Sequence, residues 1–281
     1  MVNILVPTDL SEVSKIAVQY AVKIVNKLGG TLTLLHVVTI MQPTRATMRL
    51  QLKSLERDLI ETAKEDLDIF VRTISKQLNS NEPINVIVVQ GTSFNETVKR
   101  EARILRTGLI VMGTKGASGV RKYVLGSNTT SVIEVSHVPV LAVPEEAEFK
   151  SFKNVIYATD LRHVEEELKV LIPYLDEFNS TVHLLHITPS LHEVSALEKK
   201  IEAIIKKAGI TNVISKVIVN KEIDEAIDYY VKESHADLLT MFTPDVNFYE
   251  KLFDRSMTRK MAFQSKIPLL AFRQLNVNVK E

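Results

Sequence analysis

The chain has 281 residues, of which 45% are hydrophobic and 25% are charged, and its formal net charge is +1 at pH 7. This length favours two domains, and the composition is that of an ordinary globular protein. The near-neutral charge disfavours a dedicated nucleic-acid-binding protein. Because the chain has no cysteine, a disulfide framework, a thiolate nucleophile and a zinc–thiolate site are excluded.

The N-terminal stretch MVNILVPTDLSE has no basic segment and reaches a proline and an acid early. This pattern predicts a β-strand rather than a secretory signal. No stretch approaches the roughly 18 consecutive apolar residues that a transmembrane helix needs. We therefore expect a soluble cytoplasmic protein with no membrane partner.

Strand and helix patterns alternate along the first half of the chain. Short, nearly continuous apolar runs predict strands, and longer amphipathic stretches predict helices. The strands are expected near 2–7, 31–38, 84–90, 108–113 and 139–143, and the helices over 11–28, 44–79, 93–106 and 127–136. Strands that are apolar on both faces are typical of a parallel sheet covered by helices on both sides.

The second half repeats the first. NILVPTDLSE is matched by NVIYATDLRH, TLTLLHVVT by TVHLLHITP, and SHVPVLAVP by SKIPLLAFR. The second copy is shorter because the long helical stretch 44–78 corresponds to only 190–208. The predicted fold class is α/β, with two tandem doubly wound five-stranded parallel sheets in the strand order 3-2-1-4-5. The predicted domains are 1–147 and 148–281, joined through the charged stretch 144–153.

Four of the nine glycines fall in MGTKGASGVRKYVLGSNTTS, residues 112–131. This stretch opens where strand 4 is predicted to end, beside strand 1, at the position where a doubly wound sheet binds its ligand. Glycine lets backbone approach an anion closely. Ser127 is expected to cap the next helix, whose N-terminus suits a phosphate. Further charge and hydroxyl groups are supplied by Lys115, Arg121, Lys122, Thr129 and Thr130.

The glycine spacing discriminates between phosphate-binding motifs. Neither G-x4-G-K-S/T nor G-x-G-x-x-G is present, which excludes a Walker A loop and disfavours a dinucleotide site. The spacing is G-x2-G-x9-G-S, formed by Gly113, Gly116, Gly126 and Ser127. Together with PTD after strand 1, LLHV in strand 2 and PVLAVP in strand 5, it resembles the ATP-binding branch of the universal stress protein (UspA) family. The resemblance extends over essentially the whole chain, as two tandem domains.

The resemblance implies an ATP site in the first copy. The adenosine end would lie at Pro7, Thr8 and Asp9, and the backbone of Val37 would meet the adenine. Met112 and Gly113 would lie under the ribose and the first phosphate. The phosphates would be held by Gly116, Gly126, Ser127 and the N–H of Asn128, with a divalent cation, expected to be Mg²⁺, bound mainly by phosphate oxygens and water.

The second copy departs from this pattern. Phe242, Asp245 and Arg255 stand where the first copy has the three glycines, and Ser256 alone is retained. The benzyl group would block the nucleotide sterically, and the carboxylate would repel its phosphates. We therefore expect the second copy not to bind ATP. Its loop TPDVNFYEKLFDRS is a candidate for contacts with an unknown protein partner. The resemblance also implies that VPVLAVP and IPLLAFR pair within the chain as a pseudo-dimer, and homodimerisation of whole chains stays open.

Several residues allow a structural interpretation. Asp9 and Asp160 are expected to cap the helices that follow them. His36 and His186 end apolar strands and are expected to be structural rather than metal ligands. A phosphorylated receiver domain is disfavoured, because the ends of strands 3 and 5 read Gln90-Gly91 and Val143-Pro144.

The motifs are compatible with three functional classes. The first is an ATP-binding stress or regulatory protein, the second a slow ATPase or phosphotransferase, and the third an interaction module without nucleotide. An efficient hydrolase needs a base or a water-orienting residue beside the γ-phosphate. The motif provides none, so the sequence favours the first class and leaves enzymatic activity uncertain, with slow hydrolysis as its upper limit.

Overall fold

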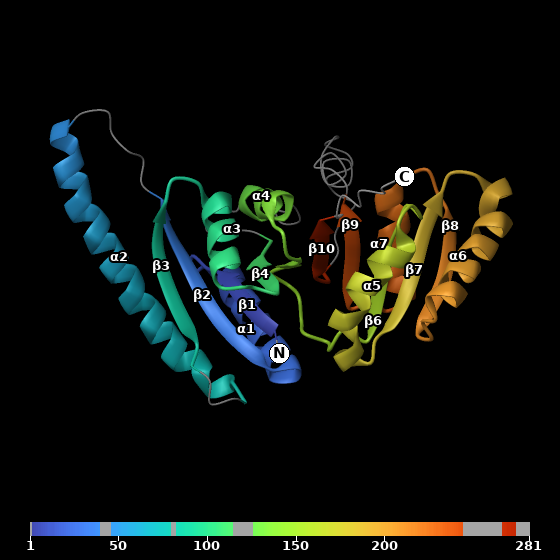
Figure 1. Ribbon diagram of the computed structural model, residues 1–281, viewed down its shortest axis with the longest axis horizontal. Coiled ribbons are helices and arrows are strands. Elements are labelled where there is room, and N and C mark those ends of the chain that lie inside the picture. Colours follow the sequence, from blue (N-terminus) through green and yellow to red (C-terminus); the bar gives the residue numbers. More distant parts are fainter. Residues whose placement is uncertain (1, 40–45, 80–82, 115–125, 244–265, 274–281) are drawn as a thin grey trace. The chain divides into compact units, whose positions relative to one another are not determined.

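The computed structural model describes residues 2–39, 46–79, 83–114, 126–243 and 266–273. These residues form two compact units, one reaching Glu145 and one beginning at Glu146. Each unit is an α/β sandwich with a parallel sheet (Figure 1). The predicted fold class is thus confirmed. No helix in the described ranges is long and apolar enough to cross a bilayer.

Unit 1 has five parallel strands in the predicted order, β3-β2-β1-β4-β5. The strands are β1 (Val2–Pro7), β2 (Gly30–Thr39), β3 (Asn85–Gly91), β4 (Leu109–Gly113) and β5 (Val140–Val143). The helices are α1 (Glu12–Leu28), α2 (Ala46–Ile74), α3 (Phe94–Ile104) and α4 (Ser127–Val135). The long helix expected to reach residue 79 ends at Ile74 and continues as a short 3-10 turn, Ser75–Gln77.

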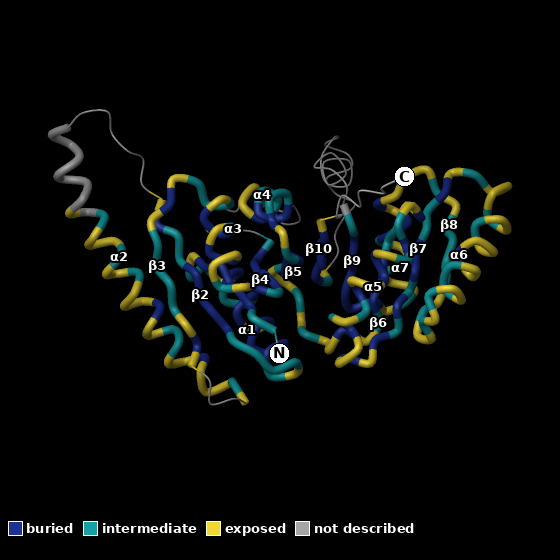
Figure 2. Tube along the Cα trace, viewed as in Figure 1, coloured by how far each residue is buried: buried dark blue, intermediate teal, exposed yellow. Residues whose placement is uncertain are grey.

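The strand order and right-handed crossovers together determine which face of the sheet each helix covers. Such crossovers place α1 and α2 on one face of the sheet and α3 and α4 on the other, where α3 packs beside α4. The central strands are consequently covered twice, and Leu5, Val6, Ile110 and Val111 are completely buried. The central strands form the dark interior of unit 1, the edge strand β3 is mostly of intermediate burial, and the helices turn their outer sides to solvent (Figure 2). This burial explains why the strand sequences are apolar throughout.

Unit 2 has the same winding. Its strand order is β8-β7-β6-β9-β10, with β6 in the centre. The strands are β6 (Asn154–Ala158), β7 (Thr181–Thr188), β8 (Val213–Val219), β9 (Leu238–Thr243) and β10 (Leu269–Arg273). The helices are α5 (Val164–Leu175), α6 (Val194–Ala208) and α7 (Ile223–Glu233), with short 3-10 turns at Asp176–Phe178 and Leu191–Glu193. The repeat in the sequence is therefore a repeat of topology.

Candidate functional site

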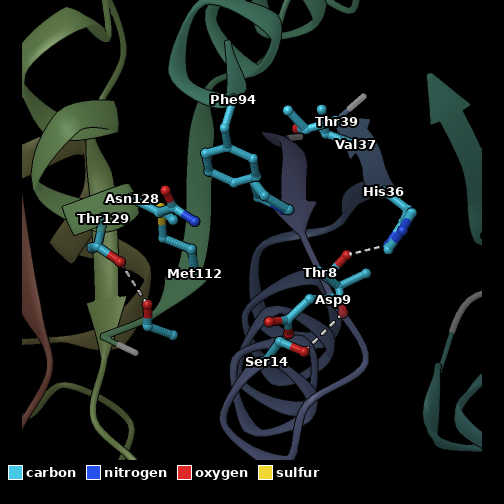
Figure 3. A pocket seen from close by; sticks show the side chains of 12 residues that line it. Thr8, Asp9, Ser14, His36, Val37, Thr39, Phe94, Met112, Asn128 and Thr129 are labelled. Carbon is cyan, nitrogen blue, oxygen red and sulfur yellow. Dashed lines mark hydrogen bonds between the residues drawn. The ribbon is translucent and has the colours of Figure 1, made fainter. Parts of the chain in front are cut away.

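A cavity of about 350 Å³ opens at the carboxyl ends of the central strands of unit 1. This volume lies within the range of small-molecule sites. Its walls come from the ends of β1, β2 and β4 and from the starts of α3 and α4, with one residue from α1 (Figure 3). The lining residues are Pro7, Thr8, Asp9, Ser14, His36, Val37, Thr39, Phe94, Met112, Gly113, Asn128 and Thr129.

Hydrogen bonds fix the turn that follows β1. The Nδ1 atom of His36 lies 2.9 Å from the carbonyl oxygen of Thr8. The Thr8 hydroxyl is 2.9 Å from the Ser14 hydroxyl and accepts a bond from the Leu10 N–H at 3.1 Å. Leu10 has a φ of 59°, in the left-handed region that few non-glycine residues adopt. The side chains of the β1–α1 turn therefore hold an unusual backbone bend at the floor of the cavity.

Unit 2 repeats this arrangement with its own residues. The Nδ1 atom of His186 lies 2.9 Å from the carbonyl oxygen of Thr159, whose hydroxyl accepts from the Leu161 N–H at 3.1 Å. Leu161 also has a positive φ, 67°. The two histidines thus tie neighbouring strand ends together in both units. Their predicted structural role is confirmed for these contacts.

The two aspartates do not cap helices, and this prediction is wrong. The N-cap of α1 is Ser11, which accepts from the Ser14 N–H. Asp9 instead accepts from the N–H of Ser11 at 3.1 Å, and Asp160 accepts from the N–H two residues ahead at 3.0 Å. Each aspartate stabilises the turn between strand and helix, as the short acidic side chain does in an Asx-turn. One residue, Leu10, separates Asp9 from the cap Ser11, and two residues separate Asp160 from the cap His163.

Gly113 is required by the packing of α1. A Cβ at this position would lie 2.7 Å from Cγ1 of Val13 and 3.1 Å from its carbonyl oxygen. The sequence suggested that glycine admits a ligand to the backbone, whereas the structure gives a different first reason, the close approach of a helix. The carbonyl of Gly113 accepts a 2.8 Å bond from the buried Thr129 hydroxyl, which fixes α4 to the end of β4.

The helix α4 at the edge of the cavity begins one residue earlier than expected. Gly126 is the N-cap and Ser127 is the first helical residue, so the predicted capping role of Ser127 is wrong. The first backbone bond of the helix joins Thr130 N–H to the Gly126 carbonyl. The N–H groups of residues 127–129 have no partner inside the helix and lie at its positive end. An anion at this end would be stabilised by both effects.

The structure brings most of the predicted site residues together. Seven line the cavity: Pro7, Thr8, Asp9, Val37, Met112, Gly113 and Asn128. Gly126 and Ser127 begin α4 without lining it, and Gly116, Lys115, Arg121 and Lys122 lie outside the described residues. The sequence prediction missed Ser14, Thr39 and Phe94. For Phe94 the available signal was its position directly after strand 3, at the carboxyl edge of the sheet.

Several polar groups of the cavity are already engaged in hydrogen bonds within the protein. The Thr8 and Thr129 hydroxyls and the His36 Nδ1 atom are engaged in bonds that fix strand ends and turns. Within the described residues, no group of three or more His, Asp or Glu side chains could hold a metal ion. What the cavity offers a ligand is an apolar wall, the carboxylate of Asp9 and the start of a helix.

Unit 2 has an aromatic cluster at the position that corresponds to Gly113. The Phe242 ring stacks on Phe272 with centroids 4.5 Å apart and meets Tyr157 edge-on at 5.9 Å. Phe272 in turn contacts Tyr174 of α5 at 5.7 Å, so this cluster lies on the α5 face of the sheet. The exchange of glycine for phenylalanine thus has a packing reason within unit 2. That unit 2 does not bind ATP stays a prediction.

The fold and the cavity define a class of protein, a doubly wound α/β protein with a cavity at the topological switch point of its sheet, where such proteins bind their ligands. The model of the Universal stress protein family matches residues 1–144. This match includes every strand and helix of unit 1 and therefore the whole cavity. The chain belongs to the universal stress protein family.

Individual relatives agree with this assignment. The chain is 29% identical over 146 residues to universal stress protein MJ0531 of Methanocaldococcus jannaschii, which covers 50% of this chain and 81% of that protein. It is 23% identical over 295 aligned positions to universal stress protein Slr1230 of Synechocystis, covering 97% of this chain and 100% of that one. The similarity to the second relative extends through both units.

Solved structures support the fold. A universal stress protein from Archaeoglobus fulgidus superposes with a TM-score of 0.68 over 97% of this chain and 98% of its own, at 18% identity. A second structure, the protein PA1789 of Pseudomonas aeruginosa, gives a TM-score of 0.59 over 96% of this chain at 12% identity. At these identities the similarity concerns the fold alone.

Proposed function

We propose that unit 1 binds ATP and that the protein acts as a nucleotide-dependent regulatory protein of the stress response. The observation that carries the proposal is the cavity at the switch point, lined by seven residues that the glycine pattern and its neighbouring motifs had singled out. The start of α4 adds a phosphate-compatible end to this cavity. Mg²⁺ would be held by the phosphate oxygens and water.

A regulatory role is favoured over catalysis because polar side chains of the cavity are already engaged in hydrogen bonds within the protein. A hydrolase needs a positioned base or water-orienting group near the γ-phosphate. The Thr8, His36 and Thr129 side chains are instead tied to the backbone of the cavity itself. Slow hydrolysis and a non-nucleotide interaction module are the alternatives that the first experiment separates.

The remaining parts of the proposal concern the whole chain. Unit 2 is a second domain of the same family, supported by its identical strand order. It would not bind ATP and would serve contacts with an unidentified protein partner. Pairing of the last strands as an intrachain pseudo-dimer, homodimerisation and a cytoplasmic location stay predictions.

The first experiment is the nucleotide content of the purified protein, followed by calorimetric titration with Mg-ATP. About one ATP per chain, unchanged on incubation, is the expected result. ADP as the sole nucleotide would favour the hydrolase. If nothing is bound and added Mg-ATP is not taken up, the interaction module becomes the better reading.

Variants test whether ATP binding depends on the glycine pattern. The double change Gly116→Asp and Gly126→Arg introduces the residues of the second copy and is expected to abolish binding. Gly119→Arg is the matched control, because this glycine lies in the same stretch but outside the pattern. Intact affinity in the double variant would remove the basis of the proposal.

A further inference from the structure

Phe94 is an aromatic side chain of the cavity that the family resemblance did not assign. It is the first residue of α3, it is half-buried, and its ring lines the cavity. In the close-up, the ring lies between the end of β2, with Val37 and Thr39, and the side chains of Met112 and Asn128 (Figure 3).

The turn before Phe94 is held firmly. The buried Thr97 hydroxyl donates to the Ser93 carbonyl at 2.7 Å, and the Thr97 N–H donates to the same oxygen at 3.1 Å. Gly91 ends β3 so close to this hydroxyl that a Cβ would lie 2.1 Å from it. The Ser93 hydroxyl also bonds the Asn95 side chain. The backbone that carries the Phe94 ring is therefore positioned before any ligand arrives.

The cavity combines two kinds of groups. Phe94, Val37 and Met112 contribute apolar side chains, and beside Met112 the residues Asn128 and Thr129 form part of the first turn of α4 (Figure 3). An anionic group is stabilised at the helix end. The flat, weakly polar part of the same ligand is therefore directed towards the apolar wall, where an aromatic face offers stacking.

We propose that Phe94 contacts the nucleobase and sets the preference of the site for ligands that carry an aromatic base. This inference rests on the proposed function and adds a specificity-determining residue to it. An aromatic face binds a base through stacking, which tolerates any base but rewards the larger purine surface. Because the backbone that carries the ring is already held, binding costs little main-chain conformational freedom at this position.

The test compares Phe94→Ala, Phe94→Leu and Phe94→Tyr with the wild-type chain. The matched control is Ile223→Ala, because Ile223 is the first residue of α7 as Phe94 is of α3 and is 45% exposed. Mg-ATP affinity is measured by calorimetry. Phe94→Ala is expected to weaken it about tenfold, Phe94→Tyr to retain it, and Ile223→Ala to leave it unchanged.

A second readout separates direct contact from a change in fold. With ATP in excess and a protein deuterated except at its phenylalanine and tyrosine rings, saturation of the ring signals is transferred to the adenine protons only when a ring lies against the base. This transfer is expected in the wild-type and Phe94→Tyr proteins and should decline strongly in Phe94→Leu. Melting temperatures of the variants check that unit 1 remains folded.

The outcomes distinguish the two proposals. If the wild-type chain binds ATP and Phe94→Ala binds it equally well, the role of Phe94 is overturned while the proposed function stands. Unaltered saturation transfer in Phe94→Leu has the same meaning. If the wild-type chain binds no adenine nucleotide, both proposals fall together.

Discussion

Gly113, at the end of β4, lies against α1, and a Cβ at this position would meet both the side chain and the backbone of Val13. Adding a methyl group there forces the helix or the strand to move. Such overpacking costs about 1–3 kcal/mol. We expect Gly113→Ala to lower the free energy of unfolding of unit 1 by about this amount, as measured from urea unfolding curves.

The partner residue supplies the control for this prediction. Adding Val13→Ala removes the Cγ1 atom that lies 2.7 Å from the new Cβ but leaves the carbonyl contact. Gly113→Ala should therefore cost less stability when it is introduced into the Val13→Ala variant than when it is introduced into the wild type. Simple additivity of the two losses would contradict a direct clash between them.

A second residue-scale prediction concerns Tyr157 in the core of unit 2. Its hydroxyl donates to Glu167, and both side chains are buried. Burial, then the negative charge of Glu167, raises the pKa of Tyr157 far above its usual value near 10. The neutral phenol is thus favoured by folding. The raised pKa of Tyr157 contributes fully to the stability of unit 2 below pH 10. This contribution is lost as the pH rises above 10, because only the unfolded chain releases the proton.

We expect the stability of unit 2 to fall between pH 10 and pH 11 by up to about 1.4 kcal/mol from this group. Tyr157→Phe should be less stable than the wild type at pH 8 and should lose less stability over that interval. Tyr229→Phe is the control, because its ring is 61% exposed. An equal alkaline loss in Tyr157→Phe and wild type, in urea unfolding at each pH, would refute the assignment.

At the scale of elements, the cap of α1 is coupled to the cavity. Ser11 accepts from the Ser14 N–H at 3.3 Å, and the Ser14 hydroxyl meets Thr8. Losing an N-cap serine costs about 1 kcal/mol. We expect Ser11→Ala to destabilise unit 1 by about this amount and Ser11→Asp to be nearly neutral, with amide hydrogen exchange of the first turn of α1 as the measurement.

Ser131→Ala provides the comparison for this prediction. Ser131 also carries a local bond, to the Asn128 carbonyl within α4, but it caps no helix. Its loss is expected to cost less than about 0.5 kcal/mol. If both alanine variants had the same effect, the cap of α1 would have no special role.

The strands were predictable because they are short apolar runs between polar turns, and β1 and β4 show this most clearly. Helix ends were less predictable. Asp9 looked like a cap because aspartate often is one, but two more turn residues fit before α1. Ser127 was misplaced for a similar reason, since glycine can also occupy a cap position.

At the scale of the whole molecule, a single nucleotide site should stabilise one unit only. A ligand that binds the folded form alone raises stability by about 2.7 kcal/mol at a hundred times its dissociation constant. We expect Mg-ATP to slow hydrogen exchange in the peptides around residues 5–14, 34–39 and 109–114. The equivalent peptides of unit 2, around 156–165 and 184–189, should be unaffected.

Magnesium with inorganic phosphate is the control for this experiment, because it lacks the base and the ribose. Equal slowing in both units on adding Mg-ATP would indicate two sites and contradict the inactive second copy. Slowing by phosphate alone that matches ATP would indicate an anion site without nucleoside recognition.

The sequence by itself determined the fold class, the strand order, the internal repeat and the location of the cleft, because these depend on apolar periodicity and on the handedness of crossovers. Tertiary structure decided which side chains meet. Phe94 follows an outer strand, β3, and joins the cavity only because α3 begins above its edge. Gly113 is needed because of Val13, a residue 100 positions earlier, and such proximity is fixed by packing rather than by any local pattern.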